Sequence, residues 1–394
     1  MDAIEIAPDP PLPPCLVIPF DAECVLPRRC LPVAALLQYG FPNPFAVPYD
    51  GAGIPVWSDS LPHYIHATLL LSCPVPQRET VEWLLSDIRQ RVPTPRSFSR
   101  AAVLPCKVLP NHLPIWVLSF WDRLSEAYDT CLSWRKSLNW VNTACARHPA
   151  GQRLIPELDS LFQRVRWHGY LTGKRRDRCV KDIFDFLSNN ELDSGQVGDL
   201  LELIERRLAD TSDSRYLIAP TELAMLILYS HESHAEDEYR KQPIQQSVEE
   251  ELIQRHRSAV ASVSWTSVGT RGHWVPYIVD PIASTIFYGD PLGRRIPADL
   301  RDALQWWICD LRRRMGEPTT SPIFEPILAT SQEDSFSCGI LSTNSLLHHL
   351  LPHGFPLVSK DAVSIKMYRI ERTIEILELS AEPVCMSLNV VHAR

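Results

Sequence analysis

Cys338 differs from the other cysteines of the chain in the residues that surround it. It lies in Gln332-Glu-Asp-Ser-Phe-Ser-Cys338-Gly339, a polar loop that leads into an apolar helical run. A cysteine at the amino end of a helix faces unpaired backbone N–H groups and the positive end of the helix dipole, and both favour a thiolate. This position predicts a nucleophile. Gly339, directly after it, is expected to let a substrate backbone approach closely.

A nucleophilic thiolate needs a proton carrier and a group that orients this carrier. His273, at the turn-to-strand junction Gly272-His273-Trp274, is the candidate carrier, and Asp290 closes the next predicted strand. Antiparallel pairing of the two strands would bring both side chains to one edge of a sheet. Gln332 can direct an amide N–H toward a developing oxyanion. Each residue alone is a weak indication, but the order His, Asp, Gln, Cys together predicts a cysteine peptidase site.

The elements that must position these residues alternate between helical and strand periodicity. Strands are predicted at 261–266, 274–279, 285–288 and around 324–328, and helices at 298–314 and from near Cys338. Further helices are predicted at 180–187, at 197–208 and after Thr221, whereas the polar stretch 236–256 is expected to be an exposed helix or an insertion. This pattern predicts an α+β fold with a small antiparallel sheet.

The motifs resemble those of the ubiquitin-like-protein-specific cysteine proteases, the SUMO (sentrin) protease family related to adenovirus proteinase. The resemblance covers roughly residues 175–380, and the matching text is His273-Trp274-x5-Asp280, Ile286-Phe-Tyr-Gly-Asp290-Pro-Leu292, Trp306-Trp307 and Gln332-x-Asp-Ser-x-Ser-Cys338-Gly339-Ile-Leu-x2-Asn344.

This resemblance implies a papain-like (adenain-type) α+β fold in which His273, Asp290 and Cys338 form a triad and Gln332 helps to build the oxyanion hole. It implies hydrolysis after the C-terminal Gly-Gly of a SUMO-like or other ubiquitin-like modifier through a Cys338 thioester, in deconjugation or precursor processing. Trp274 is expected to contact the substrate tail. No cofactor is expected.

One departure from the family leaves other functions open. The family's domain opens with Trp-Leu-x-Asp, whereas the corresponding text here is Glu191-Leu192-Asp193-Ser194, or in a second register Phe186-Leu187-Ser188-Asn189. A module that binds a ubiquitin-like modifier with weak or no turnover is therefore an alternative. Deneddylase or deubiquitinase specificity is the near alternative, and acyl transfer on the same triad is a more remote one.

Three regions are predicted along the chain. Residues 1–20 are proline-rich and are expected to form a flexible leader, 21–165 form a mostly helical region of unknown function, and 175–394 form the catalytic domain. An amphipathic helix near 114–146 carries an apolar stripe that either packs on its own domain or binds a protein partner. A helix is also predicted after Thr80.

Composition excludes several other classes. The 394 residues carry a net charge of -8 and 11 cysteines without a CxxC pair, which argues against a nucleic-acid surface, a disulfide framework and a zinc ribbon. With no secretory signal and no apolar stretch long enough for a bilayer, an intracellular protein of the nucleus or cytoplasm is expected, without membrane contact. The histidines at 231, 234, 348, 349 and 353 lack a matching ligand set, so no metal site is predicted. The basic runs 174–176 and 312–314 are interpreted as solvated faces.

Overall fold

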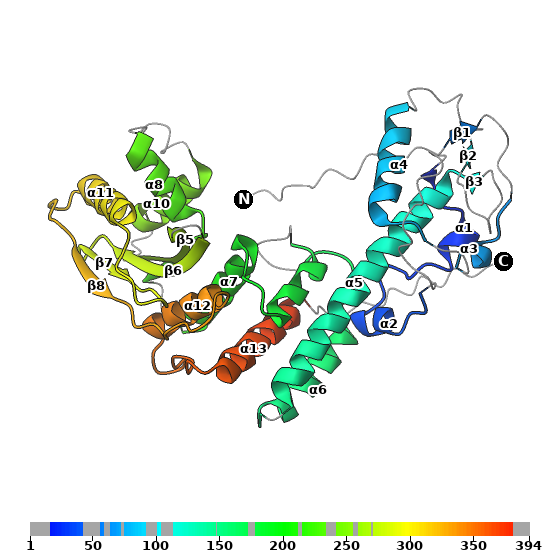
Figure 1. Ribbon diagram of the computed structural model, residues 1–394. Helices are drawn as coiled ribbons and strands as arrows, with labels where there is room; N and C mark the ends of the chain where they lie inside the picture. The colour runs from blue at the N-terminus through cyan, green and yellow to red at the C-terminus, as the bar shows by residue number, and fades with distance from the viewer. Residues whose placement is uncertain are drawn as a thin grey trace, which may run out of the picture. The chain divides into compact units, whose positions relative to one another are not determined.

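The chain forms two compact units in a computed structural model (Figure 1). One unit contains Met1–Arg135 and Arg166–His168, and the other contains Lys136–Val165 and Gly169–Arg394. The division falls within one long helix, α5 (Trp116–Cys145). The structure describes residues 16–41, 56–58, 64–71, 75–91, 101–103, 113–146, 148–171, 178–211, 215–233, 242–254, 259–268 and 271–380.

The first unit combines short helices with a small antiparallel sheet. The strands follow the order β1-β2-β3. Their bounds are Val56–Ser58, Ala101–Val103 and Leu113–Pro114. The helices are α1 (Phe20–Glu23), α2 (Val33–Leu37), α3 (Ala67–Leu71), α4 (Arg78–Arg91) and the first part of α5.

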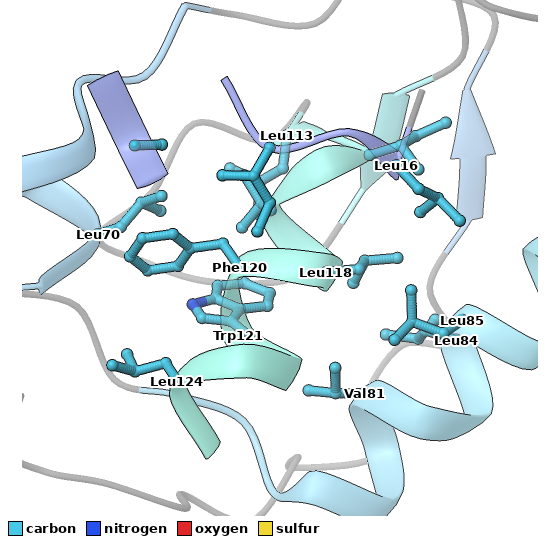
Figure 2. Close-up of a cluster of buried hydrophobic side chains, with 14 of the residues drawn as sticks. Leu16, Leu70, Val81, Leu84, Leu85, Leu113, Leu118, Phe120, Trp121 and Leu124 are labelled. Atoms are coloured by element: carbon cyan, nitrogen blue, oxygen red, sulfur yellow. The ribbon is translucent and has the colours of Figure 1, made fainter. Parts of the chain in front are cut away.

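The apolar stripe of α5 is buried within the chain itself. Phe120 and Leu124 are fully buried, and Figure 2 shows them with Trp121 among leucines of other elements, including Leu70 and Leu84. The helices predicted near 114–146 and after Thr80 are therefore present as α5 and α4. The α5 stripe serves the packing of this unit, the first of the two alternatives considered for it.

The end of the predicted leader belongs to this core as well. Leu16 is fully buried and Ile18 is 9% exposed, because both pack in the cluster around α4 and α5. The apolar side chains of Leu16 and Ile18, at the end of the proline-rich stretch, thus pack in the core. The prediction of a flexible leader over residues 1–20 is therefore wrong for these two residues. Residues 1–15 lie outside the described residues.

The second unit contains a five-stranded mixed sheet in the order β4-β5-β6-β7-β8. Its central strands β5 (Ala259–Val268), β6 (Arg271–Asp280) and β7 (Thr285–Tyr288) are antiparallel, as predicted. The edge strands β4 (Tyr216–Ile218) and β8 (Ile323–Pro326) add parallel pairs, with β5 and β7 respectively.

Helices cover both faces of this sheet (Figure 1). The helices α8 (Leu223–Ser233), α10 (Pro243–Gln254) and α11 (Ala298–Arg314) share a core with Tyr277, Val279 and Ile286 of the sheet. On the other face lie α12 (Cys338–Leu350) and α7 (Ser194–Asp210). The remaining elements are α6 (Gly151–Phe162), the 3-10 helix η3 (Val180–Leu187) and α13 (Ala362–Ser380). The α+β class is therefore confirmed.

Two sequence expectations about polar segments are wrong in this unit. The stretch 236–256 was expected to lie outside the core, yet Val248 and Leu252 of α10 pack inside it. Arg312 was expected on a solvated face, but it is 6% exposed and donates to the carbonyl groups of Pro281, Ile282 and Pro318. In both cases contacts with distant segments, which periodicity does not report, bury the residues. The basic run 174–176 lies outside the described residues.

None of the helices in the described part of the chain combines the length and the apolar character that a membrane span requires.

Candidate active site

His273 is held at the start of β6, where it pairs with Thr266 of β5. The Thr266 hydroxyl donates to the His273 carbonyl oxygen over 3.2 Å, which fixes the backbone at this position. The residue is 3% exposed. The rigid strand thus presents the imidazole with little freedom to rotate away, as the position at a turn-to-strand junction predicted.

Asp290 binds His273 directly. Its Oδ1 lies 2.7 Å from Nε2 of His273, and both side chains are nearly inaccessible to solvent. The same Oδ1 accepts the backbone N–H of Leu292 over 2.7 Å, which holds the carboxylate in the turn after β7. Antiparallel pairing of β6 with β7 produces this contact, so the structure brings the two predicted residues together.

Gly289 allows the chain to reach this turn. Its N–H donates to the carbonyl of Pro276 on β6, and a Cβ built on it would lie 3.0 Å from the Ile327 backbone oxygen and side chain. A larger residue would therefore clash with Ile327 and disturb the turn that carries Asp290. The close approach of the backbone at Gly289 to Ile327 explains why a glycine directly precedes Asp290.

Cys338 is the first residue of α12 and interacts with the same imidazole. It is 2% exposed, and it is among the groups that raise the pKa of His273, so its thiol lies near that ring. Because Nε2 of His273 binds Asp290, Nδ1 is the nitrogen left for the thiol. The structure therefore brings Asp290 and Cys338 to the His273 ring, and the sulfur of Cys338 lies at the amino end of α12.

The electrostatics of this group favour a charged imidazole. Burial by itself lowers the pKa of His273, but the hydrogen bonds to Asp290 and Cys338 and the negative charges of both outweigh burial and raise the pKa from 6.5 to about 9. At neutral pH the ring is thus an imidazolium between two groups that can be negative. Such an imidazolium can neutralise the negative charge of a thiolate and later donate its proton to a leaving group.

Asp334 organises the loop before Cys338. Its Oδ1 accepts the backbone N–H groups of Phe336 and Ser337 over 3.0 and 2.8 Å, and its Oδ2 accepts the Ser337 hydroxyl over 2.6 Å. These bonds close a tight loop that ends where α12 begins. Asp334 stands in the Gln332-x-Asp motif, but a role for it did not follow from the sequence, because an aspartate in a polar loop is most often solvated.

Gln332 lies beside the triad and contacts Asp334. Its backbone N–H donates to the carbonyl of Pro291, next to Asp290, and its Nε2 donates to the Asp334 carbonyl over 2.9 Å. Its Oε1 is buried and has no hydrogen-bond partner within the described residues. The structure therefore brings Gln332 to the site with its amide N–H turned toward the loop.

Trp274 is part of the wall of the site. It is 2% exposed, its indole N–H donates to the Leu192 carbonyl over 2.8 Å, and its ring lies edge-on against Trp265. Its own carbonyl accepts the Ser342 hydroxyl of α12 over 2.7 Å. Trp274 thus ties β6 to α12 and to the segment before α7, in addition to any contact with a substrate.

Gly339 has a packing role that differs from the predicted one. A Cβ at this position would lie 3.2 Å from Leu192 and Val197 side-chain carbons and 3.3 Å from Cδ1 of Trp274. The glycine lets the first turn of α12 pack closely against α7 and β6. This packing by itself accounts for a glycine at position 339.

The structure distinguishes the two registers considered for the missing tryptophan. Phe186 is fully buried in the core, so it cannot line a substrate channel. Glu191 is exposed and directly precedes Leu192, the residue that binds Trp274. In the register Glu191-Leu192-Asp193, the first residue is therefore an exposed carboxylate next in sequence to the residue that binds Trp274.

The predicted histidine runs have other contacts. Nδ1 of His348 lies 2.8 Å from the Phe355 carbonyl oxygen, and the ring of His349 packs against Phe287, where burial lowers its pKa. Among the residues that the structure describes, no group of three or more His, Cys, Asp or Glu side chains could hold a metal ion. His234 lies outside them.

A buried cysteine, histidine and aspartate in this arrangement form the kind of site that carries out thiol-dependent acyl transfer. Neither a family model nor a curated protein matches the sequence.

Three solved structures are similar to part of this chain. The SUMO protease Ulp1 with its catalytic cysteine oxidised to a sulfonic acid is 14% identical, with 59% of this chain and 96% of that chain covered and a TM-score of 0.43. The C-terminal Ulp1 protease domain in complex with Smt3, the yeast ortholog of SUMO, is 16% identical with the same coverage and a TM-score of 0.41. ChlaDub1 from Chlamydia trachomatis is 15% identical, with 49% of this chain and 93% of that chain covered and a TM-score of 0.30. At these values, the interpretation of the site depends on its own geometry.

Proposed function

We propose that the protein is a cysteine peptidase that hydrolyses the bond after the C-terminal Gly-Gly of a SUMO-like or other ubiquitin-like modifier. The observation that carries the proposal is the His273 ring, which binds Asp290 through Nε2 and interacts with Cys338 at the amino end of α12. The choice of substrate class comes from the sequence motifs around these three residues.

The reaction assigns one role to each group. The Cys338 thiolate attacks the glycine carbonyl carbon, and the bond to the leaving amine breaks as the His273 imidazolium gives that amine its proton. A water molecule then attacks the thioester while neutral His273 accepts a proton from it, which releases the carboxylate and regenerates the thiol. Asp290 keeps the ring oriented throughout.

The oxyanion of each tetrahedral intermediate needs N–H donors. The Cys338 backbone N–H at the start of α12 is one, and the Gln332 amide is the second. Because Nε2 of Gln332 donates to Asp334 in the free protein, the amide must turn toward the substrate carbonyl when substrate binds.

The burial of the site supports a slender substrate. Cys338 and His273 are 2% and 3% exposed, so only a chain segment with little side-chain volume can reach the sulfur. Two consecutive glycines meet this requirement.

A second candidate function is modifier binding with weak or no turnover. The exposed Glu191, where the family has a tryptophan, favours it, because a carboxylate cannot supply the apolar contact that an aromatic residue would give a diglycine tail. Deneddylase or deubiquitinase specificity, in contrast, requires the same chemistry and differs only in the modifier recognised. A protein partner of residues 21–165 remains a proposal, and it does not involve the α5 stripe.

Electrophilic modifier probes test these proposals. SUMO, ubiquitin and related modifiers that end in a diglycine electrophile are incubated with the full chain, with Cys338→Ala and with the control Cys309→Ala, whose thiol is partly exposed and lies on α11. We expect covalent labelling of wild type and of the control but not of Cys338→Ala, which folds normally. Absence of labelling by every probe would refute the peptidase proposal, and the preferred probe identifies the modifier.

A further inference from the structure

Arg369 is a buried cation of α13 whose hydrogen bonds all go to backbone carbonyl groups. Its side chain is 1% exposed. Nε donates to Phe186 over 2.6 Å, and Nη2 donates to Asn190 over 2.6 Å and to Asp185 over 3.2 Å. A charge is costly to bury, and carbonyl dipoles offset this cost only when they converge on it. The residue therefore fixes three backbone positions at once.

The three carbonyls belong to one segment. Asp185 and Phe186 are near the end of η3, where the last carbonyl groups of a helix lack intrahelical partners and carry the negative end of its dipole. Asn190 follows in the turn that leads to α7. Arg369 thus caps η3 and sets the path of the chain that leaves it.

This segment ends at the active site. Leu192, two residues after Asn190, accepts the indole N–H of Trp274, the neighbour of His273. The Cβ of Leu192 also lies 3.2 Å from the position of a Cβ on Gly339, the neighbour of Cys338. The segment is therefore held by Arg369 at one end and contacts the neighbours of both reacting residues at the other.

We propose that Arg369 is a positioning residue of the Cys338 site, which acts through residues 185–192 on Trp274 and Gly339 and so keeps His273 and Cys338 in register. This inference rests on the proposed function in that Cys338 is the nucleophile. Arg369 touches no reacting atom, so its role is distinct from that of the triad.

The charge of Arg369 supports the same role. Burial lowers the pKa of Arg369 to about 10, while the negative charges of Asp334, Asp185 and Cys338 act to raise it, so the side chain stays positive at neutral pH. Arg369 thus interacts with Asp334 and Cys338 through its charge, and His273 from β6, itself bound to Asp290, also interacts with Cys338. The positive charge of Arg369 favours the thiolate form of Cys338.

The alkylation of Cys338 by iodoacetamide tests the proposal without any modifier. The rate is measured by mass spectrometry of the Cys338 peptide between pH 5 and 10, in the full chain and in R369Q, R369K and the control R312Q. Arg312 is a matched control because it is also buried and donates to backbone carbonyls, but near the far end of β6 from His273. Thermal unfolding of each variant is recorded in parallel.

We expect R369Q and R312Q both to unfold at lower temperature, but only R369Q to change the alkylation. In R369Q the rate at pH 7 falls roughly tenfold, since a small displacement of reacting groups costs up to about a hundredfold, and the half-maximal rate moves to higher pH. R369K keeps the positive charge but lacks the planar guanidinium group that donates to several carbonyls at once. Its alkylation rate is therefore expected to lie between those of wild type and R369Q.

A wild-type alkylation profile in R369Q, with stability lowered as in R312Q, would show that Arg369 only supports the fold and would overturn the proposal. If R369Q does not fold, R369K decides: slower alkylation supports the positioning role, and a wild-type rate and profile overturn it. Failure of every modifier probe on wild type would refute the peptidase proposal and leave this result unaffected.

Discussion

Replacement of Asp290 by asparagine tests the central electrostatic element of the site. Asparagine keeps the size of the side chain and an oxygen that can accept from His273, but it removes the negative charge 2.7 Å from Nε2. Burial lowers the pKa of His273, and the charge of Asp290 is one of the causes that raise it. Without this charge, the effect of burial is less well compensated. We therefore expect this pKa to fall from about 9 toward 6.5.

The size of the effect follows from the two pKa values. At pH 7.5 a histidine with a pKa of about 9 is about 97% protonated, whereas one with a pKa of 6.5 is about 9% protonated. The imidazolium that balances the Cys338 thiolate therefore becomes about tenfold less populated. Loss of the orienting carboxylate adds to this decrease, so we expect a loss of reactivity on the order of tenfold.

Iodoacetamide alkylation of Cys338 as a function of pH measures this change. Wild type is expected to react faster at neutral pH, because the His273 imidazolium that favours the thiolate persists up to about pH 9, whereas Asp290→Asn reacts about tenfold more slowly there and accelerates as pH rises. Asp280→Asn is the control, since Asp280 lies at the other end of β6 and accepts the Ala283 N–H, which an asparagine oxygen also accepts.

The reasoning would be refuted by an Asp290→Asn protein that is folded and reacts within twofold of wild type from pH 6 to 9. That outcome would mean that the charge of Asp290 does not hold the proton on His273, and that the contact of 2.7 Å serves only to support the turn.

Two further predictions concern stability. Gly339→Ala places a methyl group 3.2 to 3.3 Å from Leu192, Val197 and Trp274, so we expect a loss of about 1 to 3 kcal/mol in urea unfolding; a stability equal to wild type would show that α12 can shift without cost. The raised pKa of His273 also makes stability depend on pH, because the folded protein keeps a proton that the unfolded chain releases above pH 6.5. This contribution is complete below pH 6.5 and is lost as pH rises through about 9, so the difference in unfolding free energy between wild type and His273→Gln should decrease by about 3 kcal/mol over that range. A difference that does not vary with pH would contradict the assignment.

The candidate site was largely predictable from the sequence because its signals are local. His273 opens a strand, Asp290 closes the next one and Cys338 opens a helix, and periodicity reports each of these boundaries. Antiparallel pairing of neighbouring strands then brings His273 and Asp290 together with few alternatives. The bounds of β7 and α11 match the predicted ranges for the same reason.

Only the tertiary structure decided which polar and small residues are buried, and against what. Arg369 and Phe186 are 183 positions apart, and Gly339 packs against Leu192 and Val197 from a distant segment. The burial of a charge or a glycine depends on such long-range contacts, which composition and periodicity do not record. The sequence by itself therefore indicated the candidate reacting groups, whereas the packing that holds them in place, through Asp334, Trp274 and Arg369, became visible only in the folded chain.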